Sequence, residues 1–91
     1  MIKKMKKKVI FKQVREKLLN YLAYDPDNII EERDISLSSR LKKFSFFRVY
    51  DVDDFIISLM WYYKIKEPLG AFNGNSRIKD IVNRIYELKY A

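Results

Sequence analysis

The sequence predicts an all-α protein, a small bundle of three to four helices that forms one domain. In three separate segments apolar residues recur at intervals of three and four, which is the spacing of an amphipathic helix. With 91 residues the chain is long enough for a single modest core. Seven Tyr, six Phe and one Trp supply more apolar bulk than a disordered chain carries, so folding is expected.

The first predicted helix runs from about residue 9 to residue 23. Its apolar stripe ends before Asp25-Pro26-Asp27-Asn28, where proline cannot continue a helix and the Asx side chains favour a turn. Residues 29–34 are expected to form a loop or short turn, and residues 36–49 fit either a loop or a short helix capped by serine. The side chains expected to hold this connection to the core are Ile35, Leu37 and Leu41.

The second helix is predicted from about residue 53 to residue 64. An acidic cluster at its start, Asp51, Asp53 and Asp54, complements the helix dipole. Its apolar surface is wider than one face requires, so the helix is either central in the core or partly exposed as a partner site, and the central position is favoured. The predicted buried stripe is Phe55, Ile56, Leu59, Met60 and Tyr63, with Ile57, Trp61 and Tyr62 toward the flanks.

The third helix is predicted to begin at a cap on Asn75 or Ser76 and to run to about Lys89. Its pattern is the most regular in the chain, because every apolar residue fits one face and the charged residues fit the other. The predicted core side is Ile78, Ile81, Val82, Ile85 and Leu88.

The net charge of +7 is concentrated at the N-terminus. Residues 1–17 carry eight basic side chains and one acidic side chain, whereas the remainder is balanced. This distribution predicts a basic N-terminal arm at residues 1–8, followed by a helical domain at residues 9–91. A cationic arm suits phosphate groups or acidic protein surfaces. The candidate phosphate-binding residues are Lys3, Lys4, Lys6, Lys7, Lys8 and Lys12.

The absence of two residue types argues against several functional classes. It contains neither Cys nor His, which removes thiol nucleophiles, ordinary zinc sites and imidazole acid–base chemistry. No catalytic motif is present, so we expect no enzymatic activity and no cofactor. Helix capping explains the acidic cluster without a metal ion, so no metal site is expected. The longest apolar run, residues 55–63, falls short of the roughly 20 residues of a membrane span, and a soluble, cytoplasmic protein is expected.

The order of these segments resembles that of acyl carrier proteins. The resemblance covers Val14 to Leu88 and includes the small-polar and apolar loop Ile35-Ser-Leu-Ser-Ser-Arg-Leu41 and the acidic entry Asp51-Val-Asp-Asp54. The chain is similar also to an uncharacterised bacterial carrier-like group that has an Asp-Asp pair at this entry. The resemblance implies a helical bundle with a long irregular connection between its first two major helices.

The chain departs from carrier proteins at the functional position. Carrier proteins attach phosphopantetheine to the serine of an Asp-Ser-Leu triplet at the start of the second helix. The corresponding triplet here is Asp51-Val52-Asp53 or Val52-Asp53-Asp54, and neither contains a hydroxyl group. Carrier proteins are also strongly acidic, and the body of this chain is neutral. The resemblance therefore implies a scaffold whose acyl-carrying function is lost.

Two functions of different classes remain. The first is a non-enzymatic protein-binding module of the immunity, antitoxin or adaptor type, with another protein as its partner. The alternative is a nucleic-acid-binding protein that grips phosphates with its Lys-rich arm. The sequence leaves the oligomeric state open. The candidate protein-interface residues are Asp51, Asp53, Asp54, Trp61 and Tyr62.

Overall fold

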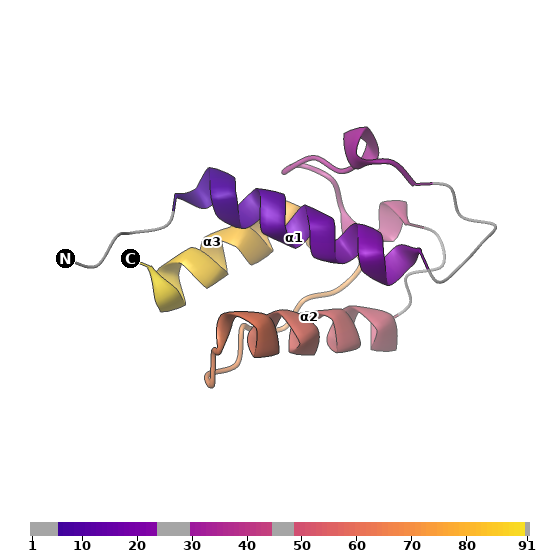
Figure 1. The fold of residues 1–91 in the computed structure, drawn as a ribbon. Coiled ribbons are helices and arrows are strands. Elements are labelled where there is room, and N and C mark those ends of the chain that lie inside the picture. The colour runs from indigo at the N-terminus through magenta and orange to yellow at the C-terminus, as the bar shows by residue number, and fades with distance from the viewer. Residues whose placement is uncertain (1–5, 24–29, 45–48, 91) are drawn as a thin grey trace.

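Three α-helices make up most of the described chain, which in this computed structural model comprises residues 6–23, 30–44 and 49–90, with the backbone alone for residues 49–51. The predicted all-α class is confirmed over these ranges, with three α-helices and two single-turn 3-10 helices between the first two of them. The α-helices are α1 (Lys7–Leu22), α2 (Val49–Tyr63) and α3 (Ile78–Lys89), and the 3-10 helices are η1 (Glu32–Asp34) and η2 (Leu41–Lys43) (Figure 1).

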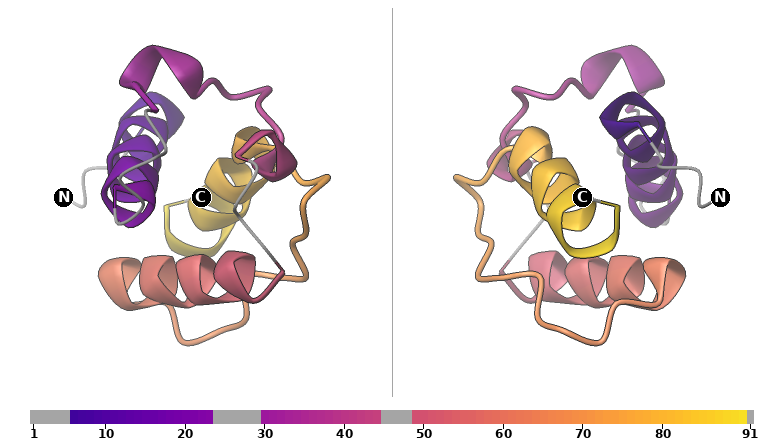
Figure 2. Two further views of the ribbon diagram at one scale, coloured as in Figure 1. Left: turned by 90° about the vertical axis from the view of Figure 1, so that its right-hand side faces the viewer. Right: turned by 90° about the vertical axis from the view of Figure 1, so that its left-hand side faces the viewer.

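Helices α1 and α3 run antiparallel and pack against each other, and α2 lies along one side of this pair (Figures 1 and 2). The first turn of α1 and the last turn of α3 lie at the same end of the molecule (Figure 1). The Lys7 ammonium stands 5.0 Å from the centre of the Tyr86 ring there. Cations are unfavourable in the first turn of their own helix, but here they lie beside the negative carboxyl end of α3.

The core lies between the three helices and follows the predicted periodicity. Helix α1 buries Ile10, Val14, Leu18 and Leu22, which recur at every fourth position on one face. Leucine and isoleucine side chains from the connections close the remaining openings, and each buried side chain of this size contributes roughly 1.5–3 kcal/mol. The buried hydrophobic residues outside α1 are Ile35, Leu41, Phe44, Val52, Phe55, Ile56, Leu59, Tyr63, Ile65, Leu69, Ile78, Ile81, Val82 and Ile85.

The start of α3 is held by backbone groups of the segment 37–42. The N–H groups of Ile78 and Lys79 donate to the carbonyl oxygens of Ser39 and Leu37 at 3.0 and 2.8 Å. In return the N–H of Lys42 donates to the carbonyl of Gly74 at 2.8 Å, and a Cβ atom on Gly74 would lie only 3.2 Å from the Cβ of Lys42. These bonds satisfy N–H groups that a helix leaves unpaired in its first turn.

Two predicted helix starts are wrong by a few residues. Helix α2 begins at Val49, so the acidic cluster lies inside its first turns and does not precede it. Helix α3 begins at Ile78 with Arg77 as its cap residue, because the Ser76 hydroxyl instead accepts a bond from the Asn73 N–H at 3.0 Å. The Arg77 N–H donates to Asp80 Oδ2 at 2.9 Å, which supplies the acidic partner in the first turn.

Several predictions about burial are also wrong. Helix α2 is not central, because Ile57, Trp61 and Tyr62 are 51%, 81% and 46% exposed. The Leu37 side chain is 44% exposed and does not pack in the core. Leu37 contacts α3 through its carbonyl group, which accepts the hydrogen bond from the Lys79 N–H. Met60 and Leu88 are only partly buried, packed against the edge of the core.

The connection between α1 and α2 is a series of turns over the residues that the structure describes. The serines do not cap η2, whose cap residue is Arg40 with no side-chain bond. Instead the Ser39 hydroxyl accepts from the Ser36 N–H at 2.9 Å and closes a turn. The predicted turn at residues 25–28 lies outside the described residues. Among the helices described, none is long and apolar enough to cross a membrane.

Candidate functional site

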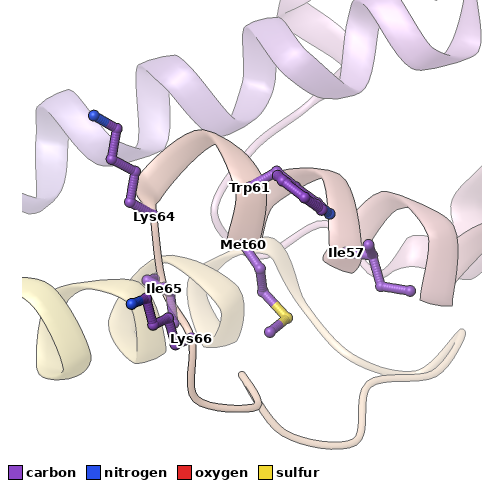
Figure 3. Close-up of a pocket in the computed structure, with 6 residues that line it drawn as sticks. All are labelled: Ile57, Met60, Trp61, Lys64, Ile65 and Lys66. Atoms are coloured by element: carbon purple, nitrogen blue, oxygen red, sulfur yellow. The ribbon is translucent and has the colours of Figure 1, made fainter.

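The outer face of α2 is the part of the described surface that exposes the most apolar bulk. Ile57 and Trp61 project from it one turn apart, on the side opposite the buried stripe of the same helix. The Trp61 ring leans along the helix toward Ile57 (Figure 3). Helix α2 is thus apolar on two sides, and α1 and α3 cover only one of them.

A groove of about 500 Å³ opens beside Trp61 at the carboxyl end of α2. Its floor is apolar, and two lysine side chains stand at its end (Figure 3). The lining residues are Ile57, Met60, Trp61, Lys64, Ile65 and Lys66.

The groove exists because the chain reverses sharply after α2. The N–H of Lys64 donates to the carbonyl of Trp61 at 3.2 Å, and the N–H of Ile65 donates to the carbonyl of Met60 at 2.9 Å. This pair of bonds is a Schellman motif, in which the residue after the helix adopts the left-handed conformation. Lys64 does so with φ of 56°, and Ile65 is thereby turned back onto the core.

The use of lysine at this position is unusual. Glycine adopts the left-handed region without a steric penalty, whereas a residue with a Cβ atom pays roughly 1 kcal/mol or more. Among the described residues Lys64 is the only non-glycine residue with positive φ. Departures of this kind concentrate at functional positions. Lys64 lines one end of the groove, and its side chain extends away from Trp61 and Ile57 (Figure 3).

The predicted acidic residues lie at the other end of the same helix. Asp53 and Asp54 are exposed, and neither forms an ion pair with another described residue. Asp51 lies within the first turn of α2, and its side chain is outside the description. No group of three or more metal-ligating side chains occurs in the described part of the chain. Asp53 and Asp54 therefore lie on the surface, without an ion pair to any cation in the described part of the chain.

The Tyr62 ring contacts side chains on α1 and α2, and sequence reasoning did not predict these contacts. The Lys17 ammonium lies 4.3 Å from the centre of the Tyr62 ring, and the Tyr63 ring meets it edge-on at 4.9 Å. The Tyr63 hydroxyl donates to Gln13 Oε1 at 2.7 Å. Burial, followed by the neighbouring Tyr62 and Tyr90, raises the pKa of the Tyr63 hydroxyl well above its ordinary value. Tyr62 therefore borders the outer face of α2 as a fixed side chain.

The lysines predicted to bind phosphate do not belong to this face. Lys3 and Lys4 lie outside the described residues, and Lys6 precedes α1. Lys7 and Lys8 are part of the first turn of α1, so that portion of the predicted arm is helical. The remaining candidate, Lys12, is exposed one turn further along α1.

Sequence reasoning found Trp61 and the acidic residues but not the groove. The spacing of Asp54, Ile57 and Trp61 is a signal that was available, because residues three and four apart share one face of a helix. The contributions of Ile65 and Lys66 had no comparable signal, since they depend on how the chain turns after α2. Comparison of the chain with protein-family models, curated proteins and solved structures gives no match.

Proposed function

We propose that this protein is a small, non-enzymatic protein-binding module, of the immunity, antitoxin or adaptor type, whose contact surface is the outer face of α2. The observation that carries the proposal is Trp61, which is 81% exposed beside an apolar groove. Tryptophan is among the residues that contribute most to protein–protein contacts. Exposed apolar surface next to a groove is typical of such contacts.

The chemistry around Trp61 supports a protein partner. The surface combines an aromatic anchor, an apolar recess and charged groups at its two ends, which is the anatomy of an interface with an apolar centre and a polar rim. Tyr62 extends the aromatic part and is already immobilised by Lys17 and Tyr63. A side chain that is fixed before binding loses less conformational entropy when a partner docks.

The scaffold in this proposal is the carrier-protein-like one that lacks its prosthetic-group serine. Support comes from the order of the elements, with α1, a connection that contains two 3-10 turns, the acid-marked start of α2, and α3. The one serine within α2 is Ser58, which donates to the Phe55 carbonyl at 2.6 Å and lies more than a turn beyond Asp53. Loss of the prosthetic group would leave the helical surface available for recognition alone.

Site-specific photo-crosslinking tests the proposed function. A benzophenone amino acid replaces Trp61 in cells that express the protein, and the control carries it at Lys79, an exposed position on α3. We expect a covalent protein adduct from position 61 and none from position 79. Failure to obtain an adduct at position 61, in protein that keeps its helical circular dichroism, contradicts the proposal.

A second candidate function, nucleic-acid binding, is favoured by one observation. The first turn of α1 contains no acidic residue, and Lys6 and Lys8 are exposed there. Glutamine substitutions at Lys3, Lys4, Lys6 and Lys8 test this function. They are preferable to deletion of residues 1–8, because Lys7 and Lys8 belong to α1 and their removal would damage the helix. If this function holds, the substitutions reduce affinity for single- or double-stranded oligonucleotides and flatten its salt dependence. Salt-independent binding, or unchanged affinity, contradicts it.

A further inference from the structure

The exposed residues of α2 form a second stripe with the spacing of a coiled-coil seam. Asp54, Ile57 and Trp61 are separated by three and four residues along α2, Lys64 follows three residues later, directly after the end of the helix, and all four are exposed. This spacing is that of the a and d positions of a heptad, which face a partner helix. The stripe lies opposite the buried one, so it is directed away from α1 and α3.

The charges along this stripe change sign from one end to the other. Asp53 and Asp54 stand near the amino end of α2, and Lys64 and Lys66 stand at its carboxyl end. A uniformly acidic or uniformly basic partner would meet repulsion at one of these ends. The complementary occupant is a helix with the same apolar centre and the same polarity, approaching in the opposite direction.

A second copy of α2 fits this requirement in a single register. When two copies lie antiparallel, the register that sets Asp54 opposite Lys64 also sets Ile57 opposite Trp61, because both pairs are centred on Leu59. The charge pairs and the apolar pairs are therefore satisfied together, and each occurs twice. Such self-complementarity is the requirement for an isologous, two-fold symmetric interface.

We propose that two copies of this chain associate antiparallel through the outer faces of α2, with Trp61 of each copy packing on Ile57 and into the groove of the other. This inference rests on the proposed function, because it identifies the partner of the same surface. In this arrangement Asp54 of each copy approaches the other copy's Lys64 and Lys66, two exposed lysines that follow the carboxyl end of α2.

The interface is small, so the association is reversible. Helix α2 has 15 residues and is roughly 22 Å long. Contact through one helix from each copy falls at the low end of specific interfaces, below about 1,200 Å² of buried surface. We therefore expect a dimer that forms in the micromolar range, with a dissociation constant on the order of 10–100 µM.

Sedimentation velocity over a range of protein concentrations tests the arrangement with charge-reversal variants. Asp54→Lys sets lysine against lysine at both ends of the dimer, and Lys64→Glu sets acid against acid. Each variant alone is expected to weaken dimerisation about tenfold or more. The double variant, and an equimolar mixture of the two single variants, restore opposite charges at both ends and are expected to recover association. Glu87→Lys and Lys79→Glu change the net charge equally on exposed positions of α3 and serve as controls.

The outcomes separate this inference from the proposed function. Loss in the single variants with recovery in the mixture supports the antiparallel pair. A wild-type chain that stays monomeric at hundreds of micromolar, or single variants that dimerise as well as wild type, overturns it. If the chain is monomeric but position 61 still crosslinks to a different protein, the inference fails while the proposed function stands. If position 61 yields no adduct either, both fail.

Discussion

At Lys64 the backbone conformation favours glycine, whereas the residue present adds a positive charge to the surface. Its φ of 56° closes the Schellman motif, and its side chain stands at the end of the groove. A glycine at this position would remove the steric cost of the left-handed conformation and would also remove the charge. The backbone conformation therefore favours glycine at this position, whereas the chain has a charged residue beside the groove.

Replacing Lys64 by glycine is expected to stabilise the fold by about 0.5–1 kcal/mol, because relief of the left-handed strain exceeds the added freedom of the unfolded chain. Urea denaturation measures the change in the free energy of unfolding. Lys66→Gly removes the same charge at a position without positive φ, and should destabilise or leave the protein unchanged. Equal effects of the two substitutions would show that charge, not backbone strain, governs the result.

Tyr63 links folding to alkaline pH. Its folded-state pKa is raised by burial above the value of about 10 in an unfolded chain, so the folded state retains the proton more tightly. This contribution is fully present below about pH 10 and decreases as the pH rises, by up to about 1.4 kcal/mol per pH unit, because only the unfolded chain ionises. The Tyr63→Phe variant lacks this dependence.

The difference between wild type and Tyr63→Phe isolates this effect from other groups that titrate at high pH. At pH 8 the wild type should be more stable by about 1 kcal/mol, the value of a typical hydrogen bond, since the bond to Gln13 Oε1 is intact. Denaturant unfolding at pH 8, 10 and 11 should show this advantage shrinking above pH 10. A constant difference across the three values would mean that Tyr63 ionises equally easily in both states.

At the scale of elements, α2 has two apolar faces with opposite roles. Phe55 is fully buried in the core, and Trp61 on the outer face is 81% exposed. Phe55→Ala is expected to cost about 3–5 kcal/mol of stability, whereas Trp61→Ala should change it by no more than about 0.5 kcal/mol. Thermal and urea unfolding of the two variants measure both values. A large loss from Trp61→Ala would indicate that this side chain belongs to the core.

The helices were predictable to different degrees for physical reasons. The stripe of α3 is one-sided, so periodicity alone identified Ile78, Ile81, Val82 and Ile85 as core residues. Helix α2 is apolar on two sides, and periodicity does not tell which side the rest of the protein covers. Its start was placed too late because acidic residues complement the dipole throughout the first turn as well as just before it.

The start of α3 illustrates a contribution from distant parts of the chain. Asn75 and Ser76 are typical cap residues, yet carbonyl groups of Leu37 and Ser39 bind the first N–H groups of the helix. Side-chain capping is local and can be read from neighbouring residues, but capping by another segment depends on the fold. The groove at the end of α2 was unpredictable for the same reason, because the positions of Ile65 and Lys66 follow from the reversal at Lys64.

For the whole molecule, the arrangement separates the buried side of α2 from its exposed apolar side. Helices α1 and α3 enclose the core with α2, and the antiparallel course of α1 and α3 sets the basic start of one beside the carboxyl end of the other (Figure 1). The outer face of α2 is left with an apolar centre between opposite charges. The net charge of +7 thus says little about this surface, whose own charges are balanced.

Trp61 is the single tryptophan of the chain, so its fluorescence reports directly on this face. The central claim, that a second copy covers the outer face of α2, predicts that acrylamide quenches this fluorescence strongly in dilute protein and progressively less as the concentration rises through the micromolar range. The Lys64→Glu variant should need about tenfold more protein for the same protection. Quenching that stays equally strong at every concentration, in protein with unchanged helical circular dichroism, would contradict the claim.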